Sequence, residues 1–192
     1  AFGVNADNVG IVGAGLLLLF VMTLLVSGGI RRSNQANIII VSATLLGLAA
    51  LVIVSFFVKG FPVQPIIDSV NDTSFTSILY GSALMFVAYT GYGRIATLGE
   101  EVSEPRTTIP KAIILAMLII VILYLAVSLT AINVMGAEAF GLSVEGKAAP
   151  LMVVAQVLSV PVIGPVITIA AITAMLGVVL NLLLGLSRVI LS

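Results

Sequence analysis

The 192-residue chain contains no cysteine, no histidine and no tryptophan. Without cysteine and histidine it lacks disulfides, a thiol nucleophile, an imidazole base and the usual ligands of zinc and haem. These absences exclude thiol enzymes and most metalloenzymes. We therefore predict neither a metal site nor a cofactor, and we expect the protein not to be an enzyme.

Charged residues are scarce as well, at 8% of the chain, whereas soluble domains carry about 25%. Hydrophobic residues make up 60%, and the mean hydropathy is +1.29. Such a chain has too little polar surface for water, so the composition predicts a membrane protein. The 8 basic and 8 acidic residues balance, which gives no reason to expect nucleic acid as a partner.

The sequence contains long stretches without charged residues. Five of them lack Asp, Glu, Lys and Arg: 8–30, 33–58, 73–93, 112–137 and 148–187. A membrane helix needs ~20 predominantly apolar residues. Each of the first four stretches fits one helix, whereas the fifth is longer and contains the helix breakers Pro150, Pro161 and Pro165.

The fifth stretch therefore predicts a short external helix followed by a final span. The chain begins with Ala1 rather than methionine, and its final span runs to the end. We interpret the whole chain as one continuous membrane-embedded part, with several spans, of a larger protein. The predicted spans are about 8–30, 36–58, 74–98 (broken near 87–93), 111–135 and 163–190, with the external helix at about 150–160.

The basic residues are unevenly distributed between the two sides of these spans. Lys59 and Lys147 lie on one side, and the other six lie on the opposite side. Loops rich in Lys and Arg face the cytoplasm, so the predicted loops 31–36 and 94–111 are cytoplasmic. The six are Arg31, Arg32, Arg94, Arg106, Lys111 and Arg188.

The third span breaks where Gly91 and Gly93 flank Tyr92 and a charge follows at Arg94. An interrupted helix frees backbone N–H and C=O groups, which at membrane depth are tolerated only inside protein or along a water-filled cavity. Freed carbonyls favour cations and freed N–H groups favour anions, so a zwitterion suits both together. We predict a substrate site here, formed by Phe86, Val87, Ala88, Tyr89, Thr90 and Gly91. Ordinary packing is the alternative for the aromatic residues and close helix packing for the glycines.

The loop after the break carries the acidic pair Glu100 and Glu101. Such a pair serves acid–base chemistry or metal binding elsewhere, but no histidine or further acidic cluster accompanies it. We interpret the loop as structural, with an interfacial salt bridge from the pair. Its other candidate residues are Pro105, Arg106 and Pro110.

Asn181 lies in the middle of the last span, where an amide without hydrogen-bond partners raises the free energy of the folded state. It is expected to face protein or a water-filled cavity. A substrate contact and a purely structural hydrogen bond between helices are both compatible with this position.

The segment FVAYTGYGRIATLGEEVSEPRTTIPKAI, from Phe86 to Ile113, resembles the sixth helix and following loop of the amino acid–polyamine–organocation permeases. The shared features are the aromatic segment, the glycine, the acidic pair and the P-R-x-x-I-P-K-A pattern. Gly29 to Asn37 resembles the loop between helices four and five of this superfamily, and Asn181 with Ser187-Arg188 resembles its eighth helix. The resemblance covers essentially the whole chain, as helices four to eight of about twelve.

This resemblance implies part of a LeuT-type bundle of inverted repeats with a discontinuous helix. It implies that the substrate ammonium meets backbone carbonyls near Val87 and Thr90, and that Phe86 or Tyr89 gates the site. Some members of the superfamily carry a lysine in helix five in place of a sodium ion. The corresponding position here is Thr44, the coupling-ion candidate, with either a proton or sodium as the ion.

The leading hypothesis is secondary active transport of amino acids by alternating access, in the plasma or inner membrane. The partners would be the lipid bilayer and a small amino acid or amine. A polyamine or other organic amine permease is the alternative, together with a non-transporting membrane subunit. A channel would need polar rings along a path, which these apolar spans lack.

Overall fold

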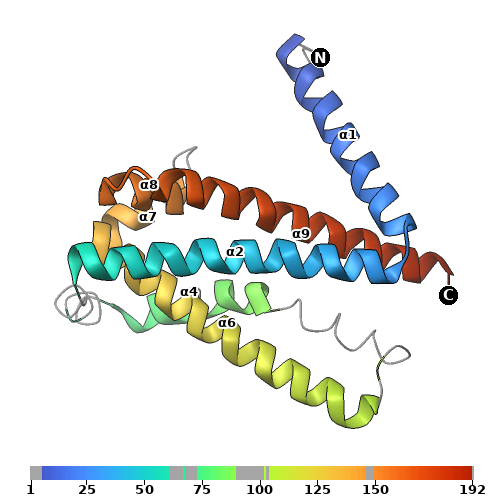
Figure 1. Ribbon diagram of the computed structural model, residues 1–192. Coiled ribbons are helices and arrows are strands. Elements are labelled where there is room, and N and C mark those ends of the chain that lie inside the picture. Colours follow the sequence, from blue (N-terminus) through green and yellow to red (C-terminus); the bar gives the residue numbers. More distant parts are fainter. Residues whose placement is uncertain are drawn as a thin grey trace. The chain divides into compact units, whose positions relative to one another are not determined.

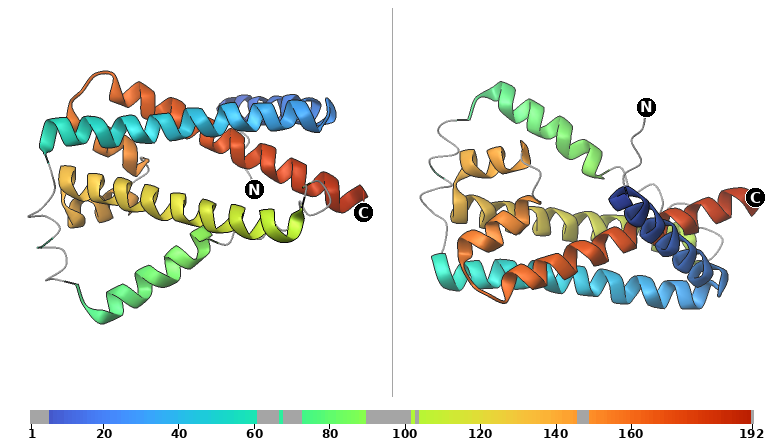
Figure 2. Two further views of the ribbon diagram at one scale, coloured as in Figure 1. Left: turned by 60° about the horizontal axis from the view of Figure 1, so that its bottom comes forward. Right: turned by 90° about the horizontal axis from the view of Figure 1, so that it is seen from above.

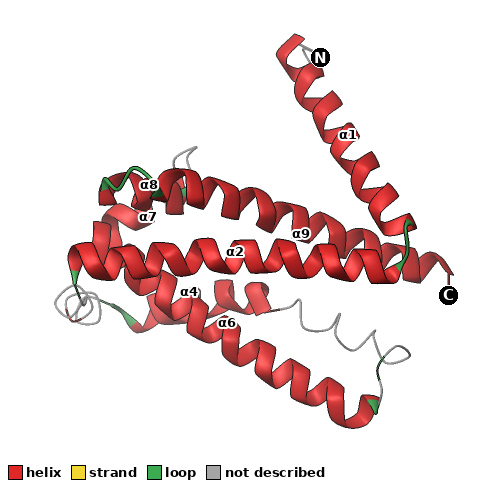
Figure 3. Ribbon diagram, viewed as in Figure 1, coloured by secondary structure: helices red, strands yellow, loops and turns green. Residues whose placement is uncertain are grey.

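The computed structural model describes residues 6–60, 67, 73–89, 102, 104–145 and 149–191. The described residues form helices and turns, with no strand among them, which confirms the predicted all-α class (Figure 3). The helices are α1 (Ala6–Ser27), α2 (Ile30–Lys59), α4 (Phe75–Tyr89), α6 (Pro105–Met135), α7 (Ala137–Glu145), α8 (Pro150–Leu158) and α9 (Ile163–Leu191) (Figure 1).

Three described segments are long and apolar enough to cross a membrane: Arg32–Lys59, Pro105–Met135 and Ile163–Leu186. Two shorter apolar helical segments, Val12–Ser27 and Phe75–Phe86, accompany them. Large apolar side chains point outward, with Leu17 67% and Ile114 69% exposed. A surface of this kind is stable against lipid but not against water, and the protein is an integral membrane protein.

Residues 31–36 form the first turns of α2, which corrects the loop predicted there. The chain reverses within two residues instead, because Gly29 adopts φ +102°, a conformation that glycine tolerates readily. The Gly29 carbonyl then accepts the first helical hydrogen bond from the Ser33 N–H at 3.2 Å. Arg31 and Arg32 thus lie within the first turn of α2 and not in a loop before it.

The predicted cytoplasmic loop 94–111 also ends earlier than expected, because α6 begins at Pro105 and contains Arg106 and Pro110. Proline suits the first helical position, where no N–H partner is needed. The Glu104 carbonyl accepts hydrogen bonds from the N–H groups of Thr107 and Thr108 at 3.1 and 3.0 Å. At 1.5 Å per residue the 31-residue helix is about 47 Å long, more than the ~30 Å hydrocarbon core, so a charged first turn fits at the interface.

Two short helices follow α6. Helix α7, which the sequence analysis did not predict, starts directly after Gly136, whose φ of +83° allows the sharp turn. Helix α8 occupies most of the range predicted for the external helix and starts with Pro150 at its first position. Both helices contact α6 and each other, as Figure 2 shows.

The described chain divides into two compact units, Ala1–Gly47 with Thr168–Ser192, and Leu48–Ile167. The second unit has an apolar core to which α2, α6, α8 and the start of α9 contribute. Leu51 and Val154 are completely buried there. The other core residues are Ala131, Val134, Ala155, Leu158, Ile163 and Ile167.

The buried core predicts that two leucines of α2 differ in their contribution to the free energy of unfolding. Leu51→Ala should lower the free energy of unfolding by about 2 kcal/mol. This value lies at the low end of the usual range because lipid tails are as apolar as the lost side chain. Leu46→Ala is the matched control, because Leu46 is 71% exposed and should lose almost nothing. Unfolding in mixed micelles measures both, and equal losses would contradict the assigned core.

Candidate functional site

The end of α4 carries the aromatic residues of the predicted substrate site. Tyr89 is half-buried, and its ring packs edge-on against Tyr124 of α6, with centroids 5.8 Å apart and an interplanar angle of 75°. Phe86, one turn earlier, is 73% exposed. Of the two gate candidates, therefore, Tyr89 is positioned by a neighbouring helix, whereas Phe86 projects from the described surface.

The rest of the predicted break lies largely beyond the described residues. Val87 and Ala88 belong to the backbone of α4, which ends at Tyr89. Thr90 and Gly91 lie outside the described part of the chain, as do Glu100 and Glu101. The broken helix and its freed backbone groups therefore stay a prediction.

A second group of polar side chains lies between α2 and α9, within the first compact unit. The hydroxyl oxygens of Thr44 and Thr173 are 2.9 Å apart and share a hydrogen bond. Thr44 also donates to the Ile40 carbonyl at 3.0 Å. The coupling-ion candidate is therefore one half of a hydroxyl pair.

Asn181 makes the other polar link between the same helices. Its side-chain Nδ2 donates to Asn37 Oδ1 at 3.2 Å and to the Gly177 carbonyl at 2.8 Å. The structure thus pairs this predicted substrate ligand with α2. Because the earlier residue of α2 meets the later residue of α9, and the reverse holds for Thr44 and Thr173, the two helices run antiparallel here.

Between the two links, α9 approaches α2 at Gly177. A Cβ atom placed on Gly177 would lie only 3.1 Å from Ile40 Cγ2, tighter than ordinary van der Waals contact. Glycine permits this approach because it has no side chain.

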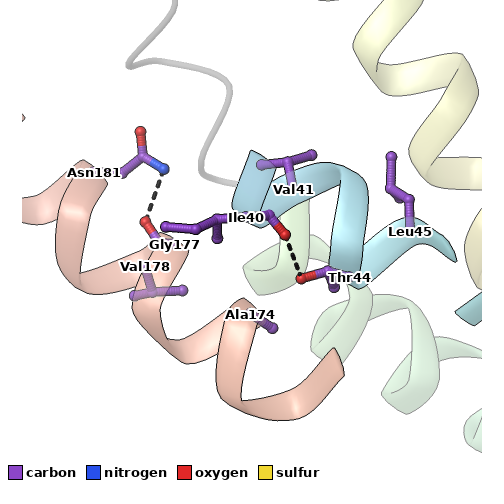
Figure 4. A pocket seen from close by; sticks show the side chains of 8 residues that line it. All are labelled: Ile40, Val41, Thr44, Leu45, Ala174, Gly177, Val178 and Asn181. Carbon is purple, nitrogen blue, oxygen red and sulfur yellow. Dashed lines mark hydrogen bonds between the residues drawn. The ribbon is translucent and has the colours of Figure 1, made fainter. Parts of the chain in front are cut away.

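A cavity of about 240 Å³ adjoins the contact (Figure 4). Thr44 and Asn181 are the polar residues of its lining, and all the lining residues are uncharged. Such a site offers hydroxyl and amide groups for hydrogen bonding, but it has no acid or base. The lining residues are Ile40, Val41, Thr44, Leu45, Ala174, Gly177, Val178 and Asn181.

Sequence reasoning missed Asn37, Thr173 and Gly177 as partners in this group. A signal was present in the spacing. Asn37 and Thr44 are seven residues apart, and Thr173 and Asn181 are eight apart, so each pair shares one helix face. The spacing identifies two polar faces, but it does not say that they meet.

Comparison with known proteins points to one family. The amino acid permease family matches residues 2–192. An uncharacterized transporter of Mycobacterium tuberculosis is 37% identical over 164 residues, which are 85% of this chain and 36% of that protein. No solved structure gives a significant match.

Two further relatives are named for their substrates. A branched-chain amino acid permease of Lactococcus lactis is 28% identical over 98% of this chain and 40% of its own length. A methylthioribose transporter of Bacillus subtilis is 28% identical over 62% of this chain and 25% of its own length. The chain thus spans well under half the length of each relative.

The pairing of α2 with α9 predicts energetic coupling between Asn37 and Asn181. We expect a double-mutant cycle of Asn37→Ala and Asn181→Ala to give an interaction energy of about 0.6 kcal/mol, the average for such bonds between membrane helices. Unfolding in mixed micelles measures the cycle. The control cycle pairs Asn37→Ala with Thr23→Ala, whose hydroxyl bonds to the Leu19 carbonyl of its own helix, and should be additive. Additivity in both cycles would contradict the link.

Proposed function

Because the chain belongs to the amino acid permease family, we propose that it forms part of a secondary transporter that moves amino acids across the membrane by alternating access. The family match over residues 2–192 is the observation that carries this proposal. The similarity to a branched-chain amino acid permease over 98% of the chain supports an amino acid as the substrate.

We place the substrate at the predicted break, 86–93. The ammonium group would meet carbonyls at the end of α4, near Val87 and Thr90, with Ala88 and Gly91 completing the backbone of the site. An aromatic wall of Phe86 and Tyr89 would close over it. The packing of Tyr89 on Tyr124 supports this part, because a ring held by a second helix needs less ordering when substrate binds.

Asn181 has a narrower role in this proposal than the sequence suggested. An amide nitrogen carries two hydrogens, and Asn37 and Gly177 engage the nitrogen of Asn181. A substrate donor would therefore meet its Oδ1 oxygen. Asn181 would contribute as an acceptor for an ammonium or hydroxyl group.

The coupling ion is proposed to act at Thr44. A threonine hydroxyl does not ionise near neutral pH, so this residue cannot serve as the titrating group of a proton-coupled cycle. Its oxygen, with that of Thr173 at 2.9 Å, instead suits a hard cation such as sodium. A dependence of uptake on sodium would support this assignment, and uptake that follows pH alone would overturn it.

Amino acid binding should be visible as thermal stabilisation of the intact protein in detergent. A ligand at 100 times its Kd stabilises by about 2.7 kcal/mol, and we expect such a shift from branched-chain amino acids. Tyr89→Ala and Gly91→Leu should abolish it, because they remove the aromatic wall and block the backbone turn. Tyr80→Ala is the matched control on α4, where Tyr80 is 69% exposed, and should keep the shift.

The same assay separates the alternatives. A shift with polyamines alone would favour an organic amine permease. A shift with none of the twenty amino acids and no polyamine would contradict the proposed substrate class. A shift that survives both Tyr89→Ala and Gly91→Leu would move the site away from 86–93.

A further inference from the structure

The Thr44 and Thr173 hydroxyls and the Asn181 amide, which form the hydrogen bonds between α2 and α9, each also have an acceptor on their own helix. We call this contact the α2–α9 seam and define it as Asn37, Ile40, Thr44, Thr173, Gly177 and Asn181. We propose that the seam is a reversible latch, at which the two helices pair and separate while Thr44, Thr173 and Asn181 each keep a hydrogen bond to their own helix.

The two threonines show how the substitution works. Thr44 lies 2.9 Å from Thr173 across the seam and 3.0 Å from the Ile40 carbonyl of its own helix. Thr173 has own-helix acceptors at 3.0 Å in the carbonyls of Ile169 and Ala170. A hydroxyl has one proton to donate, so when the helices part, each proton keeps an acceptor on its own helix.

Asn181 follows the same pattern. Its bond to the Gly177 carbonyl, at 2.8 Å, is shorter than its bond to Asn37 across the seam, at 3.2 Å. Separation therefore leaves the stronger own-helix bond in place. Separation breaks the bond between Asn181 and Asn37, which frees one amide hydrogen of Asn181 and the Oδ1 acceptor of Asn37.

Packing across the seam is equally easy to break. Gly177 has no side chain to interlock with α2, and its close approach to Ile40 depends on a single methyl group. The adjoining open pocket of about 240 Å³ lies beside the seam, where the two helices are not packed against each other. When the helices part, lipid tails can cover their apolar side chains, so the closed state has little advantage from packing. The bonds and the packing both indicate two states of similar free energy.

Distance measurements test the latch without reference to transport. The chain has no native cysteine, so spin labels can be placed at Ile38→Cys and Leu182→Cys, which are exposed positions beside the seam (57% and 49%). In liposomes we expect two distance populations. Thr173→Val removes the hydroxyl pair and should raise the ratio of separated to paired molecules about threefold.

Thr23→Val is the matched control, since it removes a hydroxyl that bonds to its own helix at Leu19. It should leave the two populations unchanged. One narrow distance that Thr173→Val does not alter would overturn the latch and make the seam a fixed contact.

A disulfide across the seam tests whether the latch opens during transport, which rests on the proposed function. In Ile40→Cys/Gly177→Cys the close approach of these positions favours a disulfide. Oxidation should reduce amino acid uptake by at least tenfold, and a reductant should restore it. For either single variant, oxidant should not change the uptake measured for the same variant under reducing conditions.

The two experiments fail in different ways. Uptake at the full rate with the disulfide formed would show that transport does not need the seam to open, and would overturn its part in the cycle. If the intact transporter that contains this chain takes up no amino acid in either redox state, the proposed function fails. The distance populations then still decide whether the latch exists.

Discussion

The whole structure depends on one requirement, that polar groups in hydrocarbon be satisfied from within the protein. The long helices meet it for the backbone. Several side chains meet it by bonding back to their own helix, as Ser82 does with the Ile78 carbonyl and Thr130 with the Ala126 carbonyl, both at 2.8 Å. Polar residues can therefore lie in apolar helices without requiring any particular neighbour.

This bonding of side chains to their own helix also affects the contacts between helices. Where a hydroxyl or amide already has an acceptor on its own helix, a second helix adds a hydrogen bond. The polar group does not depend on that second bond to be satisfied. In the first unit this produces the α2–α9 seam. In the second unit, Asn133 of α6 donates to the Gly60 carbonyl at the end of α2 at 3.0 Å, beside a core formed by interlocking apolar side chains. One unit is thus held partly by exchangeable polar bonds, whereas the other has a close-packed core.

The amino-acid sequence predicted most of the helices, but their ends less accurately. Long uncharged stretches predicted the all-α membrane class, and the pattern from Phe86 to Ile113 predicted the superfamily, to which the amino acid permease match assigns the chain. The ends were displaced at Arg31, Arg32 and Arg106, because charged residues limit an apolar stretch but do not end a helix, and α2 and α6 include them. Helix α7 was missed because its nine residues have too few apolar positions to give a membrane signal.

By itself, then, the sequence determined that this protein is helical, lies in a membrane and resembles amino acid permeases. Composition and local pattern are enough for those conclusions. Only the tertiary structure decided that Thr44 meets Thr173, that Asn181 meets Asn37, and that Gly177 allows both. The residues of these pairs lie 129 and 144 positions apart in the chain. Helical periodicity shows which residues share a face, but the packing of one helix against another decides which faces meet.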